Sequence, residues 1–255
     1  MSYSVVFNRD CVEAMREMAD NAFDLAVVDP VYGDVKQGGY MKNVESTARL
    51  AKAINYHTAL WDQKKTGQEY FDQLFRVSKN QVIWGGNYFV EEIHRNSQCW
   101  LVWDKRHPDG VAFADVELAW TSFDSAARIF RFLWNGMFQE NMKEKETRIH
   151  PTQKPVALYD WIFKRFAKPG MTVLDTHLGS GSSRIAAYNA GLDFTGYEID
   201  QTYFDMQNER FDRYTAQQSL FLPETEDDSD AEAGLFVRDE APGLFAGVPA
   251  DDGVY

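Results

Sequence analysis

Short apolar runs alternate with amphipathic stretches along most of the chain. Runs of β-branched or aromatic residues are typical of buried strands, and apolar positions three or four apart are typical of helices. This pattern predicts strands at Ser4–Phe7, Leu25–Val28, Gln81–Trp84, Trp100–Trp103, Val116–Thr121, Thr172–Leu174 and Phe194–Tyr197. It predicts helices at Cys11–Met18, Gln68–Val77, Pro155–Phe166, Ser182–Ala190 and Thr202–Tyr214. Because strands and helices alternate, we expect an α/β fold with helices on both faces of one sheet.

The pattern ends near residue 222, where the composition changes. The last 33 residues, from Pro223 onward, contain ten acidic residues against the single base Arg238, with few helix or strand signals. Such a segment does not bury enough apolar surface to fold on its own. We therefore expect a folded domain over residues 1–222 and an acidic, flexible tail over residues 223–255.

The tail changes what the net charge implies. The chain has 39 acidic and 26 basic residues, a net charge of −13, which at first argues against a polyanionic partner such as nucleic acid. The first 222 residues, however, hold 29 acids and 25 bases and are nearly neutral. Two stretches there are basic: Lys36–Lys65 has six bases and two acids, and Arg128–Lys168 has nine bases and four acids. Nucleic acid therefore stays among the candidate partners.

The cysteine content and the apolar runs indicate the compartment. The two cysteines, Cys11 and Cys99, are too few for a disulfide framework and make no zinc pattern. No secretory signal opens the sequence, and no 18 apolar residues run together. We expect a cytoplasmic protein that contacts no membrane and needs no metal.

The most informative motif lies between the last two predicted strands. Asp175 ends a strand, Gly179-Ser180-Gly181 precedes a helix, and Glu198 ends the next strand. Glycines let the backbone approach a ligand, and a carboxylate in that place accepts hydrogen bonds from ribose hydroxyls. Arg184 stands where a dinucleotide fingerprint has its third glycine, which weighs against a nucleotide-dependent oxidoreductase. A nucleoside cofactor without pyrophosphate, such as S-adenosylmethionine, fits better, although a lone Gly-x-Gly is also compatible with a plain turn.

Two further motifs carry candidate chemistry. Asp29-Pro30-Val31-Tyr32 follows an apolar strand and offers hydrogen-bond acceptors and a stacking face in one loop. His150-Pro151-Thr152-Gln153-Lys154-Pro155 opens an amphipathic helix. Taken alone, the first is compatible with a turn and the second with a proline-initiated helix.

Together these segments resemble the amino-group DNA methyltransferases, which methylate the exocyclic nitrogen of adenine or cytosine. In that family a D/N/S-P-P-Y/F loop binds the target base, an H-P-T-x-K-P segment precedes the cofactor strand, and a D-P-F-x-G-S-G-T loop holds the cofactor. This chain has D-P-V-Y at 29–32, H-P-T-Q-K-P at 150–155 and D-T-H-L-G-S-G-S at 175–182. Asn8–Cys11 and Trp103–Lys105 resemble the family's G-D-C and W-D-K segments. The resemblance covers roughly residues 1–222.

The resemblance implies a fold and a set of site residues. The fold is a Rossmann-like methyltransferase domain with a mostly parallel, seven-stranded sheet in the circularly permuted order of the β group, and with target-recognition insertions within 33–149. The catalytic residues are Asp29, Pro30 and Tyr32. The cofactor-binding residues are Asp10, Cys11, His150, Thr152, Lys154, Asp175, Gly179, Ser180, Gly181, Ser182 and Glu198.

The resemblance also implies roles within that set. Asp29 and the Pro30 carbonyl accept the two N–H bonds of the target amine, and Tyr32 stacks on a base flipped out of the duplex. Glu198 holds the ribose of S-adenosylmethionine and Asp10 its adenine amine. Thr152 and Lys154 lie near the methionine end of the cofactor. We expect His177 to fill space behind the glycine loop.

The predicted activity is site-specific methylation of adenine N6 in DNA, by a modification enzyme without a restriction domain in this chain. Asp29 favours adenine, because the family's cytosine-N4 enzymes usually carry serine at that loop position. An N4-cytosine methyltransferase is the alternative. A second alternative is a catalytically weak, methyltransferase-like DNA-binding module, because Val31 replaces a family proline and Thr176-His177-Leu178 replaces P-F-x.

Partner contacts are predicted at several places. Candidates for DNA readout are Gly38–Tyr40, Arg49, Lys64, Lys65 and Lys105–His107, whereas Trp84–Phe89 is predicted as a buried strand and turn. Gln217–Phe221 resembles the short Q-x-S/D-L-F peptides that dock on sliding clamps, or packs the end of a helix through Leu220 and Phe221. A homodimer is a further candidate assembly.

Overall fold

The computed structural model describes residues 2–33, 65–107, 114–135, 138–143 and 145–219. The acidic tail, most of the basic stretch Lys36–Lys65, and Leu220 and Phe221 of the clamp-like peptide lie outside the described residues. Gln217–Ser219 form the last turn of helix α6 (Gln201–Ser219).

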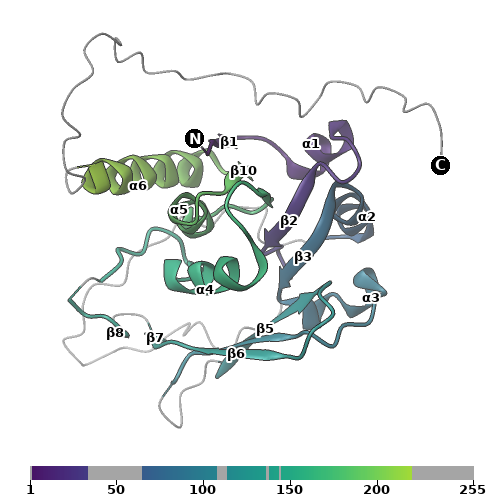
Figure 1. Ribbon diagram of the computed structural model, residues 1–255, viewed down its shortest axis with the longest axis horizontal. Coiled ribbons are helices and arrows are strands. Elements are labelled where there is room, and N and C mark those ends of the chain that lie inside the picture. The colour runs from purple at the N-terminus through teal and green to yellow at the C-terminus, as the bar shows by residue number, and fades with distance from the viewer. Residues whose placement is uncertain (1, 34–64, 108–113, 136–137, 144, 220–255) are drawn as a thin grey trace.

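Within these ranges one eight-stranded sheet runs through the molecule (Figure 1). Its order is β1 (Ser4–Phe7), β10 (Asp193–Tyr197), β9 (Thr172–Asp175), β2 (Phe23–Val28), β3 (Ser78–Trp84), β5 (Val116–Thr121), β4 (Leu101–Asp104) and β6 (Arg128–Arg131). The first five strands in this order, which are β1, β10, β9, β2 and β3, are parallel to one another. Strand β5 is antiparallel to both of its neighbours, β3 and β4. The mostly parallel sheet predicted from the sequence is confirmed.

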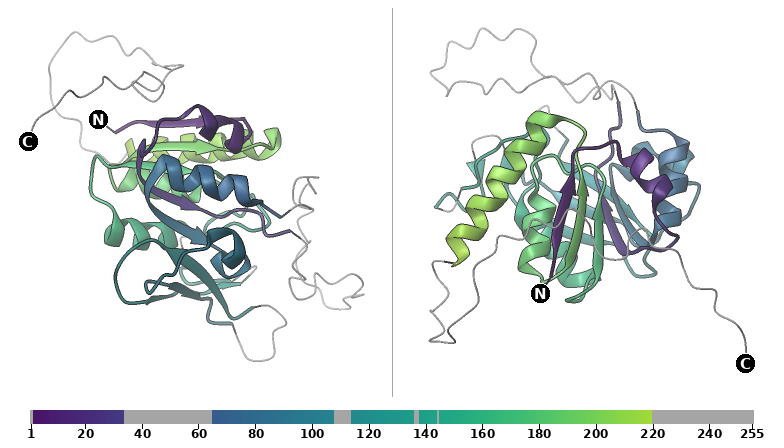
Figure 2. Two further views of the ribbon diagram at one scale, coloured as in Figure 1. Left: turned by 90° about the vertical axis from the view of Figure 1, so that its right-hand side faces the viewer. Right: turned by 90° about the horizontal axis from the view of Figure 1, so that it is seen from above.

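Helices cover both faces of the sheet (Figures 1 and 2). On one face lie α1 (Cys11–Glu17) and α2 (Gln68–Val77), with the short η2 (Gly86–Tyr88) and α3 (Val90–Ile93) beyond them. On the other lie α4 (Val156–Phe166) and α5 (Ser182–Asn189), with α6 beside α5. A small hairpin of β7 (Trp134–Asn135) and β8 (Phe138–Gln139) precedes α4.

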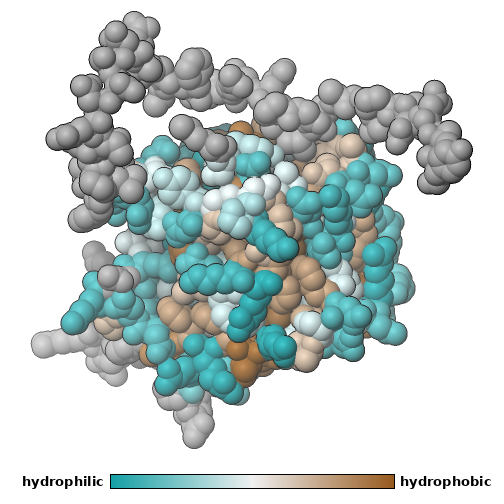
Figure 3. Space-filling view, viewed as in Figure 1, coloured by the Kyte–Doolittle hydropathy of each residue, from teal (hydrophilic) through white to brown (hydrophobic). Residues whose placement is uncertain are grey.

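The alternation of side chains along β2 explains this layering. Leu25 and Val27 belong to the core that packs on α4 and α5, whereas Ala26 and Val28 belong to the core that packs on α1 and α2. Successive side chains of a strand point to opposite faces, so a strand that is apolar throughout is buried on both sides. The space-filling view of the face that carries α4 shows an apolar area edged by hydrophilic side chains (Figure 3).

The seven predicted strands are all present, and the sheet has one more strand, β6. The sequence Arg-Ile-Phe-Arg of β6 has a base at each end, and the strand is the edge of the sheet, where Ile129 is 42% exposed. An edge strand that is half solvated lacks the continuous apolar signal of a central strand. No helix in the described ranges is long and apolar enough to cross a membrane.

The close packing of Gly86, in the turn after β3, leads to a prediction about stability. A Cβ added to Gly86 would lie 2.5 Å from Trp120 Cβ and 2.8 Å from the Trp120 backbone nitrogen. Backbone then has to shift in a closely packed region, so we expect Gly86→Ala to lower the free energy of unfolding by about 1–3 kcal/mol. Urea unfolding measures the change.

Gly67→Ala is the matched control, because a Cβ there meets nothing within 4 Å. Its effect on the free energy of unfolding should stay below about 1 kcal/mol. Equal effects of the two substitutions would contradict the packing argument.

Candidate active site

One cavity of about 640 Å³ opens at the carboxyl ends of the parallel strands. The loops that leave β1, β2, β9 and β10 carry into it Asp10, Asp29, Thr176–Ser180 and Glu198 respectively. Ligands of open α/β sheets bind at this edge, because helix N-termini and strand-end loops converge there. The volume lies within the usual range of small-molecule sites, about 300–1,000 Å³.

The glycine loop between β9 and α5 depends on left-handed backbone. Gly179 has φ +51° and Gly181, which caps α5, has φ +72°. A side chain at Gly179 would meet the ring of His150 at 3.5 Å, and one at Gly181 would meet Gln207 at 3.2 Å. Only glycine combines this backbone with close neighbours on both sides.

Glu198 ties this loop to the next strand. One carboxylate oxygen accepts the Gly179 N–H at 2.8 Å and the other accepts the Asp200 N–H at 2.9 Å. Burial raises the pKa of Glu198, although both amides act to lower it. The carboxylate lines the cavity beside the backbone of the loop.

Asp10 and Cys11 form the wall after β1. Asp10 Oδ1 caps α1 by accepting the N–H groups of Val12 and Glu13 at 2.8 and 2.9 Å. The Cys11 thiol faces the same cavity, and burial raises its pKa to about 12. It is therefore a neutral thiol at physiological pH rather than a nucleophile.

Three of the predicted cofactor residues shape the glycine loop and do not line the cavity. Asp175 is buried and accepts the Ser183 hydroxyl and the His177 N–H. The Ser182 hydroxyl accepts a hydrogen bond from Arg210 of α6 at 3.0 Å. Gly181 takes the turn into α5. The other eight predicted cofactor residues line the cavity.

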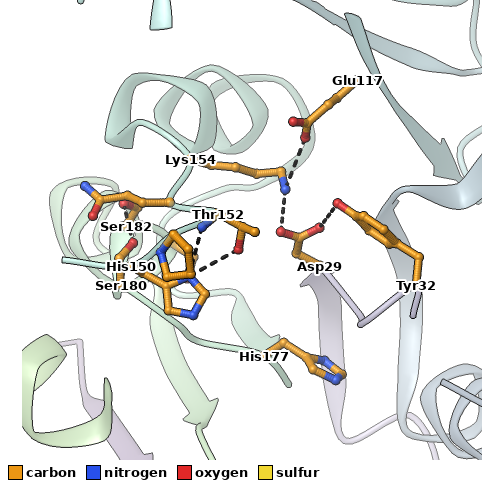
Figure 4. A network of polar contacts seen from close by, with 12 residues as sticks. Asp29, Tyr32, Glu117, His150, Thr152, Lys154, His177, Ser180 and Ser182 are labelled. Atoms are coloured by element: carbon orange, nitrogen blue, oxygen red, sulfur yellow. Dashed lines mark hydrogen bonds and ion pairs between the residues drawn. The ribbon is translucent and has the colours of Figure 1, made fainter. Parts of the chain in front are cut away.

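The catalytic residues predicted after β2 lie on the opposite side of this cavity (Figure 4). The ammonium of Lys154 contacts Asp29 Oδ2, and the Tyr32 hydroxyl donates to Asp29 Oδ1 at 3.4 Å. Burial raises the pKa of Asp29, and Lys154 opposes that rise. The Lys154 ammonium, which the resemblance puts near the methionine end of the cofactor, lines the cavity and is paired with the Asp29 carboxylate.

Tyr32 is held by the turn after β3. Its ring stacks on Tyr88, with centroids 5.0 Å apart, and meets the edge of Phe89 at 6.2 Å. A Cβ at Gly85, whose φ is +66°, would lie 2.5 Å from Tyr32 Cε1. The predicted buried strand and turn is present, but Tyr88 within it is 40% exposed and stacks on Tyr32.

The H-P-T-Q-K-P segment joins the two halves of the cavity. His150 Nδ1 lies 3.1 Å from the Thr152 hydroxyl, and its ring meets Tyr203 at 4.3 Å. Burial lowers the pKa of His150 to about 4, so the ring is neutral at pH 7. Gln153 fixes the segment by accepting the Ile149 N–H and, through its carbonyl, the Trp134 indole N–H.

His177 corrects one expectation, because it lines the cavity instead of filling space behind the loop. Its Nδ1 lies 2.9 Å from the Thr176 hydroxyl and its ring meets the edge of Tyr70 at 5.3 Å. Burial lowers the pKa of His177 to about 4. The residue that replaces the family's phenylalanine thus keeps an aromatic contact while adding nitrogen atoms to the cavity wall.

Two site residues were missed from the sequence. Tyr70 of α2 is buried and its hydroxyl lies 2.6 Å from Thr176 Oγ1. Glu117 of β5 contacts Lys154 at 3.2 Å and also pairs with Lys105. The signal for Glu117 was present, since an acid within a predicted apolar strand requires a partner.

Among the residues proposed for DNA readout, the described bases all contact acids. Lys65 pairs with Glu92, Lys105 with Glu117, and Arg106 with Glu140 at 3.0 Å. Gly38–Tyr40, Arg49 and Lys64 lie outside the described residues.

The burial of Asp175 leads to a prediction about how the stability of the protein depends on pH. Burial raises its pKa in the folded protein from 3.8 to about 7. The folded protein therefore favours the protonated form of Asp175. As the pH rises from about 4 to about 7, this preference lowers the free energy of unfolding by up to about 4 kcal/mol. Asp175→Asn keeps the shape without the charge, so the variant should gain stability relative to the wild type between pH 5 and pH 8. Urea unfolding at both pH values measures this, and a difference independent of pH would contradict it.

Comparisons with known proteins agree with this geometry. A family model described as "DNA methylase", for N6/N4 methyltransferases, matches residues 105–209. The Type II methyltransferase M.HpaI of Haemophilus parainfluenzae is 22% identical over 240 residues, covering 80% of this chain and 72% of the relative.

Two solved structures have the same fold. The complex of M1.HpyAVI with SAM superimposes with a TM-score of 0.52 at 20% identity, covering 82% of this chain and 100% of that one. The cytosine-N4-specific PvuII DNA methyltransferase does so with a TM-score of 0.52 at 12% identity, covering 83% and 87%. Residues 105–209 thus match the model of the N6/N4 DNA methylase family, and the chain as a whole is similar to a Type II methyltransferase and shares the fold of solved DNA methyltransferases.

Proposed function

We propose that this protein transfers the methyl group of S-adenosylmethionine to the N6 amine of adenine in DNA. The observation that carries the proposal is that the Asp29-Pro30 loop and the glycine loop with Glu198 line a single cavity. One side offers acceptors to an amine, and the other offers a carboxylate and bare backbone to a nucleoside.

The residues fit S-adenosylmethionine better than a phosphate-bearing cofactor. At the cofactor end the wall carries Asp10, Glu13 and Glu198. Its two arginines are paired, Arg9 with Glu17 and Arg16 with Glu69. An acidic wall repels phosphates and suits a ligand with a sulfonium and an amino group. When bound, the cofactor supplies a methyl group that its positive sulfur already activates for transfer.

Asp29 and Pro30 would orient the target amine. The lone pair of an exocyclic amine is delocalised into the ring, so the amine is a poor nucleophile. Acceptance of its two N–H bonds by the Asp29 carboxylate and the Pro30 carbonyl turns the lone pair toward the methyl group. The nitrogen gains the methyl group and loses one proton, for which Asp29 is the adjacent acceptor. Such positioning supplies up to about 7–11 kcal/mol of a barrier.

Access to this cavity requires the base to leave the duplex. The acceptors of Asp29 lie in a partly enclosed site, and its side chain is 16% exposed. Flipping a base costs a few kcal/mol, which contacts with the DNA backbone and stacking offset. The position of Tyr32 next to Asp29 supports it as the aromatic residue that would stack on the flipped ring.

Nucleoside analysis tests the activity and the target base together. The purified protein is incubated with S-adenosylmethionine and unmethylated DNA, and the digested nucleosides are identified by mass. We expect N6-methyladenine. N4-methylcytosine alone would overturn the adenine assignment, and cofactor binding without any methylation would favour the DNA-binding module instead.

Asp29→Ala tests the mechanism in the same assay. Loss of the carboxylate removes an oriented acceptor at the reacting nitrogen, so we expect kcat to fall by about 10²–10³-fold while cofactor affinity changes little. Asp72→Ala is the control, because Asp72 is exposed on α2, where it accepts a hydrogen bond from Gln68 at 2.9 Å. Full activity of the Asp29 variant would contradict the mechanism.

A further inference from the structure

Both oxygens of the Asp29 carboxylate have a donor within the protein. Oδ2 contacts the Lys154 ammonium and Oδ1 accepts the Tyr32 hydroxyl (Figure 4). The proposed function needs at least one of these oxygens for the target amine. Each carboxylate oxygen can accept a second hydrogen bond, so the amine would share Asp29 with donors that already fix its direction. Of these donors, the buried ammonium is the one whose loss of a partner is costly.

The Lys154 ammonium has a second carboxylate within reach. Glu117 Oε2 lies 3.2 Å from Lys154 Nζ, on the side away from Asp29 (Figure 4). The Lys154 side chain is only 3% exposed, and its Nζ lies 5.6 Å from the centre of the Trp84 ring. It can shift from one carboxylate toward the other without being left unpaired.

Glu117 is itself held in place. Its other oxygen, Oε1, pairs with Lys105 Nζ at 2.5 Å. Asp29, Lys154, Glu117 and Lys105 thus form a row of alternating charges whose formal sum is zero. Burial raises the pKa of Glu117, but the two ammonium groups outweigh it and bring the pKa to about 2. Both ammonium groups thus favour the ionised form of Glu117.

We propose that Glu117 and Lys154 are positioning residues for the proposed methyl transfer: Lys154 fixes the direction of the Asp29 carboxylate, and Glu117 anchors the Lys154 ammonium while Asp29 accepts the target amine. This inference rests on the proposed function and adds to it a role for the two buried charges next to Asp29. Lys154 remains close enough to stabilise the negative charge of Asp29, so that the carboxylate stays an acceptor while the amine is bound.

The inference predicts opposite pH shifts for two substitutions. Activity requires ionised Asp29 and falls at low pH as this group is protonated. Glu117→Gln removes a negative neighbour, so the acid limb of kcat should move to lower pH by about 1 unit. Lys154→Met removes a positive neighbour, so the limb should move to higher pH by a similar amount. If the two residues only maintained the fold, Glu117→Gln and Lys154→Met would not move the acid limb of kcat in opposite directions.

Other titratable groups around this pair are kept in every variant. They are Tyr32 beside Asp29, Tyr70 from α2, Lys105 after β4, Asp175 at the end of β9, Tyr159 from α4 and His150 before it. Because they are common to the wild type and the variants, the difference between Glu117→Gln and Lys154→Met reports on the two substituted charges.

The experiment measures the Asp29 titration with and without catalysis. Carboxyl ¹³C NMR of the unliganded, aspartate-labelled protein follows the pKa of Asp29, with Asp29→Asn identifying the signal. Methylation rates from pH 5 to 9 give the acid limb, and calorimetry with S-adenosylmethionine checks that each variant folds and binds cofactor with wild-type affinity. Lys154→Arg should restore the limb toward its wild-type position, since it restores the charge.

The controls are Glu140→Gln and Lys79→Met, which remove the same charges from exposed pairs with Arg106 and Asp24. These controls should leave both titrations unchanged. Opposite shifts of the Asp29 titration support the inference. If the wild type is active but the Asp29 titration does not shift in the two variants, or shifts in the same direction in both, this inference is overturned and the proposed function stands. If the wild type is inactive but the Asp29 titration still shifts in opposite directions in the two variants, the proposed function is overturned, whereas the charge coupling among Asp29, Lys154 and Glu117 stands.

Discussion

The buried ammonium of Lys154 is the interaction on which the arrangement of the site depends. A cation at this depth requires carboxylates on more than one side, and here they come from the loop after β2 and from β5. The segment before α4 supplies the cation itself. Three parts of the chain that are far apart in sequence are thereby fixed relative to one another at the edge of the sheet.

The histidines that line the cavity near the glycine loop are uncharged. His150 and His177 both have pKa values lowered to about 4 by burial, so neither adds a charge at pH 7. The polar atoms nearest the cofactor end are thus acids and neutral donors, while the cations are committed to ion pairs. Under the proposed function, this division would let one cavity hold a positively charged ligand next to an electron-poor amine without placing two unpaired cations together.

Much of the fold could be predicted from the sequence because its strands are buried on both faces. Such strands are continuous apolar runs, and the five parallel ones were found within a few residues of their bounds. Strand β6 was missed because an edge strand flanked by arginines has no such run. The permuted order stays a prediction, since a chain order alone does not test it.

The site could be predicted as far as the motifs place residues at strand ends. What the motifs could not give is side-chain direction across the cavity. Lys154 and Asp29 are 125 residues apart, and only the packed sheet brings them into contact. The direction of the Arg184 side chain could not be predicted either. Arg184 occupies the position of a glycine in the dinucleotide fingerprint, and its guanidinium donates to Gln207 and Asn208 of α6, at 3.0 and 2.8 Å.

The pairing of Tyr32 with Tyr88 bears on how a base would be selected. One face of the Tyr32 ring is already covered, so a planar ligand either takes the remaining face or replaces Tyr88. Exchange of one aromatic partner for another changes little in dispersion or in apolar area, whichever ring arrives. Stacking at this position is therefore nearly indifferent to the identity of the base, and discrimination among bases falls to the directional acceptors of the neighbouring loop.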